Sequence, residues 1–434
     1  MTGIYDRPWP VSPAAFARLA AGGGGRDAIE QLAAAQRAKH VRILSRIVAE
    51  AHTVGHPHRR WALEGRDLLA RALHHDLASA KQAVRHPSVG LWAARTLQAL
   101  LGGQPCLDAE PGGLCAIAAA AAIRARLPAE ITIPVSDGYA VLPSLGMAAA
   151  SGPTAVVRSA VGGATIGDVR LPADPHTDAQ GWTGLHRVHA GPIDGRAFDI
   201  LIDDIDPFRF PSSEQLLGRQ SAASWSQALT GGWEVLSAHH PQVAAEVAAA
   251  VSVVTPISGT SLRAVSASSP VVFGSVAMSR PANAVGCAET LTHEAQHIKL
   301  GALLDFLPLT GPDDGRRYYA PWRADPRPLG GLLQGAYAYL GVSGFWRQQR
   351  RQAGFEEHGD AQFARWRASA HLVAETMLAS GGLTSAGHEF VSGMESTLNG
   401  WQREHVSAAA RASAEQAARS HRDCWEAAHG PVRP

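Results

Sequence analysis

The sequence is poor in cysteine, shows no excess of either charge and contains no long apolar run. Its 434 residues include four cysteines without a Cys-x-x-Cys spacing. This pattern argues against a disulfide framework or a cysteine zinc knuckle and favours a reducing compartment. With 39 basic and 38 acidic residues the net charge is +1, so the charge balance does not favour nucleic acid or an anionic membrane as a partner.

Segments that would direct the chain to a membrane are also missing. The first ten residues lack a basic region followed by an apolar core, so no secretion signal is apparent. The apolar run at 115–123 is mostly alanine and is much shorter than the about 20 residues of a membrane-spanning helix. We therefore expect a cytoplasmic protein without a membrane partner.

The composition is that of a globular protein, with 46% hydrophobic and 18% charged residues. We predict an α+β, predominantly helical protein with three regions. Residues 1–128 read as helical, residues 129–280 as a β-rich region with a mixed or antiparallel sheet, and residues 281–434 as helical again.

The individual elements follow from periodicity and from glycine and proline breaks. A helix can start at Ser12-Pro13, and apolar periodicity predicts further helices at 27–51, 61–84, 89–101, 114–127, 213–253, 329–351, 360–379 and 385–418. Short β-branched or apolar segments predict strands at 131–135, 139–142, 154–157, 198–202 and 271–273.

The most informative motif is His293-Glu294-x-x-His297, within a stretch that reads as one helix. Residues four apart lie on the same helical face, so the two imidazoles can converge on one metal ion. In a zinc peptidase the glutamate of such a motif is the general base. We therefore predict a zincin-like metal-site helix, in which the two histidines would bind zinc and iron equally well; the alternative is an incidental His-Glu-His on a solvated helix face.

The third metal ligand is not evident from the pattern. The metzincin continuation is absent, because Leu303 stands where its third histidine would fall. Asp305 follows about two turns after His297 and could bind the metal only if the helix breaks first. Gln334 lies on the next predicted helix, which offers no carboxylate, and the acidic residues at 356–360 are expected in a loop.

Two other segments contain residues suited to binding. The loop at 318–328 combines prolines and aromatics with Arg323 and Arg327. These arginines could form an anion pocket, because a guanidinium binds a carboxylate through two parallel hydrogen bonds; alternatively, an Arg-Asp pair pins a proline-rich crossover. The segment at 202–209 contains three carboxylates and an arginine. It could bind a cation or a peptide backbone, but we favour a polar strand end that turns at Pro207.

Several segments together resemble one bacterial family. They are Thr292-His-Glu-x-x-His297-x-Lys-Leu300 with Asp305, Ala320-Pro-Trp-Arg-x-Asp-Pro-Arg-Pro328, Gly331-Leu-Leu-Gln-Gly-x-Tyr-Ala338, and shorter stretches at 86–92, 142–146, 204–209 and 345–346. With them the chain resembles the HExxH-motif, α-ketoglutarate-dependent peptide β-hydroxylases of peptide-modification gene clusters.

This resemblance implies an oxidoreductase, a non-haem iron(II) dioxygenase that uses 2-oxoglutarate to hydroxylate residues of a ribosomally synthesised precursor peptide. His293 and His297 would be iron ligands, Glu294 a catalytic member of the motif, and Arg323 or Arg327 the anchor of the co-substrate. The family often has a histidine where this chain has Gln334, so the third ligand stays open between Gln334 and Asp305. A zinc metallopeptidase that processes a leader peptide, with Glu294 activating water, and a non-catalytic peptide-binding scaffold with a decayed metal site are the alternatives.

Overall fold

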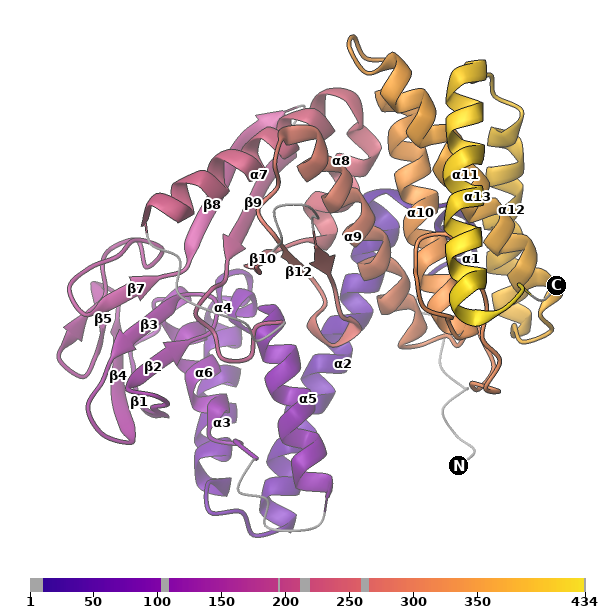
Figure 1. Ribbon diagram of the computed structural model, residues 1–434. Helices are drawn as coiled ribbons and strands as arrows, with labels where there is room; N and C mark the ends of the chain where they lie inside the picture. Colours follow the sequence, from indigo (N-terminus) through magenta and orange to yellow (C-terminus); the bar gives the residue numbers. More distant parts are fainter. Residues whose placement is uncertain (1–10, 103–108, 194–195, 211–218, 259–264, 433–434) are drawn as a thin grey trace.

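The computed structural model describes residues 11–102, 109–193, 196–210, 219–258 and 265–432 (Figure 1). Helices predominate and the strands lie in the middle of the chain, so the predicted α+β, predominantly helical class is confirmed. Every helix in these described ranges is too short or too polar to cross a lipid bilayer.

The first part of the chain is helical. Its helices are α1 (Pro13–Ala20), α2 (Gly25–Thr53), α3 (Arg59–His75), α4 (Leu77–Val84), α5 (Pro87–Leu101) and α6 (Gly113–Arg124). The single helix predicted over 61–84 is wrong, because Asp76 leaves the helical conformation. Its backbone is extended, and its side chain accepts a hydrogen bond of 3.1 Å from the amide of Ser79. Such a cap begins a new helix.

Two small antiparallel sheets follow. One has the order β1-β4-β5-β6 and the other β2-β3-β7. The strands are β1 (Ala129–Pro134), β2 (Tyr139–Leu142), β3 (Gly146–Ala149), β4 (Thr154–Ala160), β5 (Gly163–Ile166), β6 (Val169–Arg170) and β7 (Trp182–Gly184).

The third sheet is mixed and has the order β11-β12-β10-β9-β8. Its strands are β8 (His186–Ile193), β9 (Arg196–Ile202), β10 (Val253–Pro256), β11 (Ser266–Ala267) and β12 (Ser275–Met278), of which β9, β10 and β12 run parallel. The strand predicted at 271–273 is wrong. Pro270 starts a short 3-10 helix, η1 (Pro270–Val272), with Ser269 as its cap, because proline lacks the amide donor that a strand ladder needs.

The helix predicted over 213–253 is also divided. It comprises α7 (Arg219–His239) and α8 (Pro241–Ala250), and the predicted start at 213 lies outside the described residues. His240 is non-helical between them, because the ring of Pro241 disfavours a helical conformation at the preceding residue.

Helices return after β12. They are α9 (Ala284–Leu304), α10 (Leu329–Gln349), α11 (Glu356–Ala379), α12 (Ser385–Gln402) and α13 (Ala408–His429). Residues 356–360 therefore begin α11 and do not form the expected loop. The helix predicted over 385–418 is two helices, because the Ser407 side chain accepts a 3.1 Å hydrogen bond from the amide of Ala410 and caps α13.

Helix α9 lies between the mixed sheet and the C-terminal helices (Figure 1). Leu291 and Ile298 belong to a core cluster with residues of α7 and the sheet, whereas Leu300 and Leu303 belong to a second cluster with α10 and α12. Packing on both sides holds α9 in place, and α9 carries the His293-Glu294-x-x-His297 motif.

Candidate metal centre

The two motif histidines converge, as their spacing predicts. The Nε2 atoms of His293 and His297 are 3.1 Å apart, and the rings meet edge to face at 72°. Two metal–nitrogen bonds of about 2.1 Å that meet at about 95° would give this separation. Burial, followed by the charge of His297, lowers the pKa of His293 to about 3, so the His293 ring is neutral and its lone pair is available to a metal.

Glu294 lies beside this pair and is 1% exposed. Its Oε1 atom is 4.0 Å from Nε2 of His293, and its Oε2 atom is buried without a hydrogen-bond partner. A buried carboxylate oxygen without a partner is costly. A divalent cation at the two imidazoles would offset this cost by giving the carboxylate a positively charged partner. The residues present therefore fit a metal ion.

Gln334 lies beside His297 on the side away from His293. Its Oε1 atom accepts a 3.0 Å hydrogen bond from Nδ1 of His297. This bond places the proton on Nδ1 and leaves the Nε2 lone pair directed at His293, the arrangement in which a histidine ligand is usually held. The geometry therefore favours Gln334 as a group that orients a ligand.

Asp305 does not reach the site. Helix α9 continues to Leu304 without a break, and the Asp305 carboxylate accepts hydrogen bonds of 2.7 Å from both Lys39 and Gln36 on α2. Asp305 therefore ties the end of α9 to α2, and it is not among the residues around the metal-site cavity.

A cavity of about 1160 Å³ opens in front of the motif. One wall is aromatic: the Tyr339 ring packs between those of Trp322, at 4.7 Å, and Trp366, at 4.3 Å, and lies 5.4 Å from the His293 ring. Trp322 can approach α10 because residue 335 is glycine; a Cβ atom there would lie 2.4 Å from the indole nitrogen. The wall can pack against a substrate and keep water from the metal.

Arg323 and Arg327 both line this cavity, and both donate hydrogen bonds of 2.9 Å to Asp325. The loop that carries them is closed by two backbone hydrogen bonds between Tyr318 and Arg327. The Arg-Asp pairs therefore pin the loop, as one interpretation of the sequence expects. The arginines also line the cavity, and the anion pocket stays a prediction.

Arg365 is a cavity residue that the sequence did not suggest. It comes from α11, and its guanidinium lies 4.3 Å from the centre of the Trp366 ring. In the described part of the chain no carboxylate pairs with it, in contrast to Arg323 and Arg327. Nothing in the local pattern of α11 indicates that Arg365 lines the cavity, because its position there depends on the packing of α11 against α10.

Comparison with known proteins does not assign the chain to a family. No protein-family model matches it, and no curated protein is significantly similar. The resemblance to the peptide hydroxylases therefore stays a prediction.

Proposed function

We propose that this chain is a non-haem iron(II) and 2-oxoglutarate-dependent oxygenase that hydroxylates a β-carbon of a ribosomally made precursor peptide. The observation that carries the proposal is the donor set. One carboxylate and two imidazoles, from Glu294, His293 and His297, offer ligand atoms within 4.8 Å of one another. Two histidines and one carboxylate are typical ligands of iron(II) oxygenases and leave positions open for a co-substrate and oxygen.

The same donor set counts against a zinc peptidase. Such an enzyme needs three protein ligands and, in addition, a carboxylate that acts as general base. Among the described histidine, cysteine and acidic residues, this cluster has three members. Glu294 cannot both complete the ligand set and serve as a free base, so the oxygenase accounts better for the residues present.

Iron(II) at this site, with 2-oxoglutarate and O₂, would supply an oxidant able to hydroxylate an unactivated C–H bond, with succinate and CO₂ as co-products. The residues of the chain would position the reactants. Gln334 holds the His297 ring, and the wall around Tyr339 packs against the substrate. Arg365 offers the co-substrate's distal carboxylate a cation without a competing acidic partner in the described residues.

The test is turnover of a precursor peptide encoded near the gene of this chain. The protein, purified without oxygen and reconstituted with iron(II), should convert 2-oxoglutarate to succinate only when peptide is present. The peptide should gain one oxygen atom, about 16 Da. Cleavage of the peptide would instead establish the peptidase, and bound iron without turnover would favour the scaffold.

Two variants sharpen this test. His297→Ala should abolish turnover and iron binding at this site. Glu294→Gln keeps an oxygen donor at the same position, so an oxygenase should retain weakened iron binding and partial activity, whereas a peptidase would lose its base and all activity. His74→Gln is the matched control, because His74 is an exposed histidine on α3.

A further inference from the structure

A second group of metal-ligating side chains lies outside the large cavity, where the start of α5 meets the segment that follows β9. His86, Asp203 and Asp206 offer ligand atoms that all lie within 4.8 Å of one another. The segment at 202–209 is the expected polar strand end, because β9 ends at Ile202 and the chain turns at Pro207. Its carboxylates are buried, however: Asp203, Asp204 and Asp206 are 1%, 7% and 3% exposed. His86 is 3% exposed.

The carboxylates of Asp203 and Asp206 each direct one oxygen at the backbone and the other at the cluster. Oδ1 of Asp203 accepts hydrogen bonds from the amides of Ile205 and Asp206, and Oδ1 of Asp206 accepts one from the amide of Phe208. The Oδ2 atom of Asp203 faces the His86 ring, and that of Asp206 faces Ser88. The local turns therefore hold two buried carboxylate oxygens towards the same point.

Ser88 determines which nitrogen of His86 carries the proton. The hydroxyl of Ser88 donates its hydrogen to Oδ2 of Asp206 at 2.6 Å, and its oxygen is 2.8 Å from Nδ1 of His86. Because the single hydroxyl hydrogen is already used, Nδ1 of His86 must donate to Ser88. The lone pair of the neutral ring is then on Nε2.

This lone pair points at a carboxylate. Nε2 of His86 is buried without a hydrogen-bond partner, and Oδ2 of Asp203 is 3.8 Å away. The distance is too long for a hydrogen bond, and two facing acceptors repel each other. Two ligands of one metal, each bonded at about 2.1 Å, lie about 3–4 Å apart, so a cation between them would satisfy both atoms.

The charge balance agrees with this geometry. Burial raises the pKa of Asp203, as does the nearby charge of Asp206, and burial also raises the pKa of Asp206. Burial lowers the pKa of His86 to about 3. Arg209, which donates a 2.8 Å hydrogen bond to the backbone carbonyl of Asp206, offsets part of this effect on both carboxyls. A divalent cation between the ligand atoms would add further positive charge.

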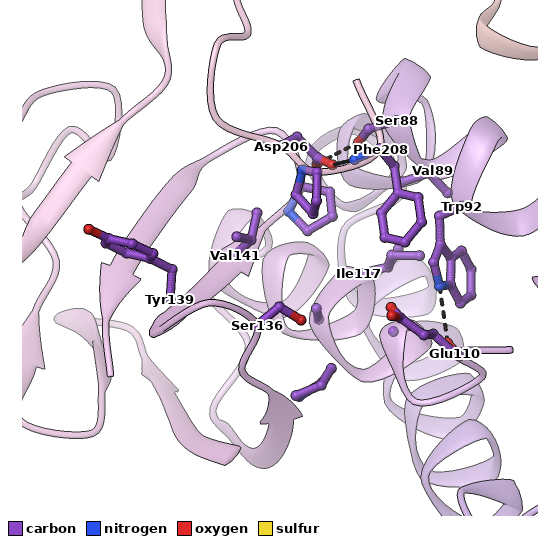
Figure 2. Close-up of a pocket in the computed structure, with 15 residues that line it drawn as sticks. Ser88, Val89, Trp92, Glu110, Ile117, Ser136, Tyr139, Val141, Asp206 and Phe208 are labelled. Carbon is purple, nitrogen blue, oxygen red and sulfur yellow. Dashed lines mark hydrogen bonds between the residues drawn. The ribbon is translucent and has the colours of Figure 1, made fainter. Parts of the chain in front are cut away.

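A cavity of about 60 Å³ reaches this cluster at Ser88 and Asp206. Figure 2 shows these two side chains joined by their hydrogen bond, with the rings of Phe208 and Trp92 nearby. The cavity has room for water, which could complete the coordination of an ion.

We propose that Nε2 of His86 and the Oδ2 atoms of Asp203 and Asp206 bind a second divalent cation of the first transition row. The mixed oxygen and nitrogen donors suit zinc(II), iron(II) or manganese(II). The ion joins the start of α5 to the end of β9, and thus the N-terminal helices to the mixed sheet. Binding of this ion does not require that the first site be an oxygenase centre.

The test uses the full chain and zinc(II) alone. The double variant His293→Ala/His297→Ala removes the first site through residues that face the large cavity and leaves the second site intact. After removal of metal with a chelator and dialysis against zinc(II), this variant should retain one equivalent of zinc. Its melting temperature should rise by about 3 °C or more.

Asp203→Asn in the same background should abolish both effects, and His74→Gln/His75→Gln, which replaces two exposed histidines, should leave both unchanged. In the otherwise unchanged chain, Asp203→Asn should lower the zinc content from two equivalents to one. The proposal is overturned if the double variant binds no zinc, or if Asp203→Asn changes neither the stoichiometry nor the melting temperature.

Discussion

Lys299, two residues after the metal-site motif, anchors α9 through a buried ion pair. The residue is 1% exposed, and its Nζ atom lies 2.6 Å from Oε2 of Glu246 on α8. Nζ also donates to the carbonyl oxygens of Gly22 and Gly23, and Oε1 of Glu246 accepts from the amide of Gly25. One ion pair therefore connects α8, α9 and the turn between α1 and α2.

Replacing Lys299 with methionine keeps the aliphatic stem but leaves the Glu246 carboxylate buried without its counter-charge. Removing one partner of a buried pair costs about 3–5 kcal/mol, and the Gly23 carbonyl also loses a donor. Since whole proteins are stable by about 5–15 kcal/mol, Lys299→Met should remove a large part of the free energy of unfolding. The double variant Lys299→Met/Glu246→Met should cost less than Lys299→Met alone, because no unpaired charge remains.

Urea unfolding, followed by tryptophan fluorescence, measures the difference at matched protein concentration. Lys39→Met is the control, because Lys39 forms a partly exposed ion pair with Asp305 and should cost about 1 kcal/mol or less. The reasoning would be refuted by Lys299→Met unfolding at the same urea concentration as the unsubstituted protein. A double variant at least as unstable as the single variant would refute it too.

Three further predictions concern the site and the response to acid. Gln334→Met should weaken metal binding about 10–100-fold by releasing Nδ1 of His297, whereas Gln334→Glu should preserve it. Competition with a chromophoric chelator measures the metal affinity of both variants, and equal affinities of the two would contradict the role assigned to Gln334. Arg365→Ala should raise the KM for 2-oxoglutarate more than Arg323→Ala does. The reverse order in steady-state assays would show that Arg323 of the loop, and not Arg365, binds the co-substrate. Burial lowers the pKa of His40 from 6.5 to about 4, so the unfolded chain binds a proton in this interval and the folded chain does not. His40 alone should therefore lower the free energy of unfolding by about 2 kcal/mol between pH 6.5 and 4.5, in addition to the losses from His86 and His293, whose pKa values burial lowers to about 3. Urea unfolding at both pH values checks this, and His40→Gln should reduce the dependence.

Local chemistry explains which elements the sequence predicts correctly. The Ser12-Pro13 start of α1 and the HExxH helix depend on neighbours within one or two turns. The errors have local causes as well: the Asp76 and Ser407 caps, together with Pro241 and Pro270, end or begin elements inside runs whose apolar periodicity continues. Hydrophobic periodicity does not register a cap, because the cap is a single side-chain hydrogen bond.

The sequence by itself determined that His293 and His297 would converge, because four residues of α-helix bring two side chains to one face. Only the tertiary structure decided which partners surround these histidines and the second cluster. Gln334 is 37 residues from His297 at the first site, and Ser88 is 118 residues from Asp206 at the second. Contacts at such separations depend on how whole helices and sheets pack, which burial of apolar surface decides. The pattern of residues near each polar group therefore did not reveal its partner.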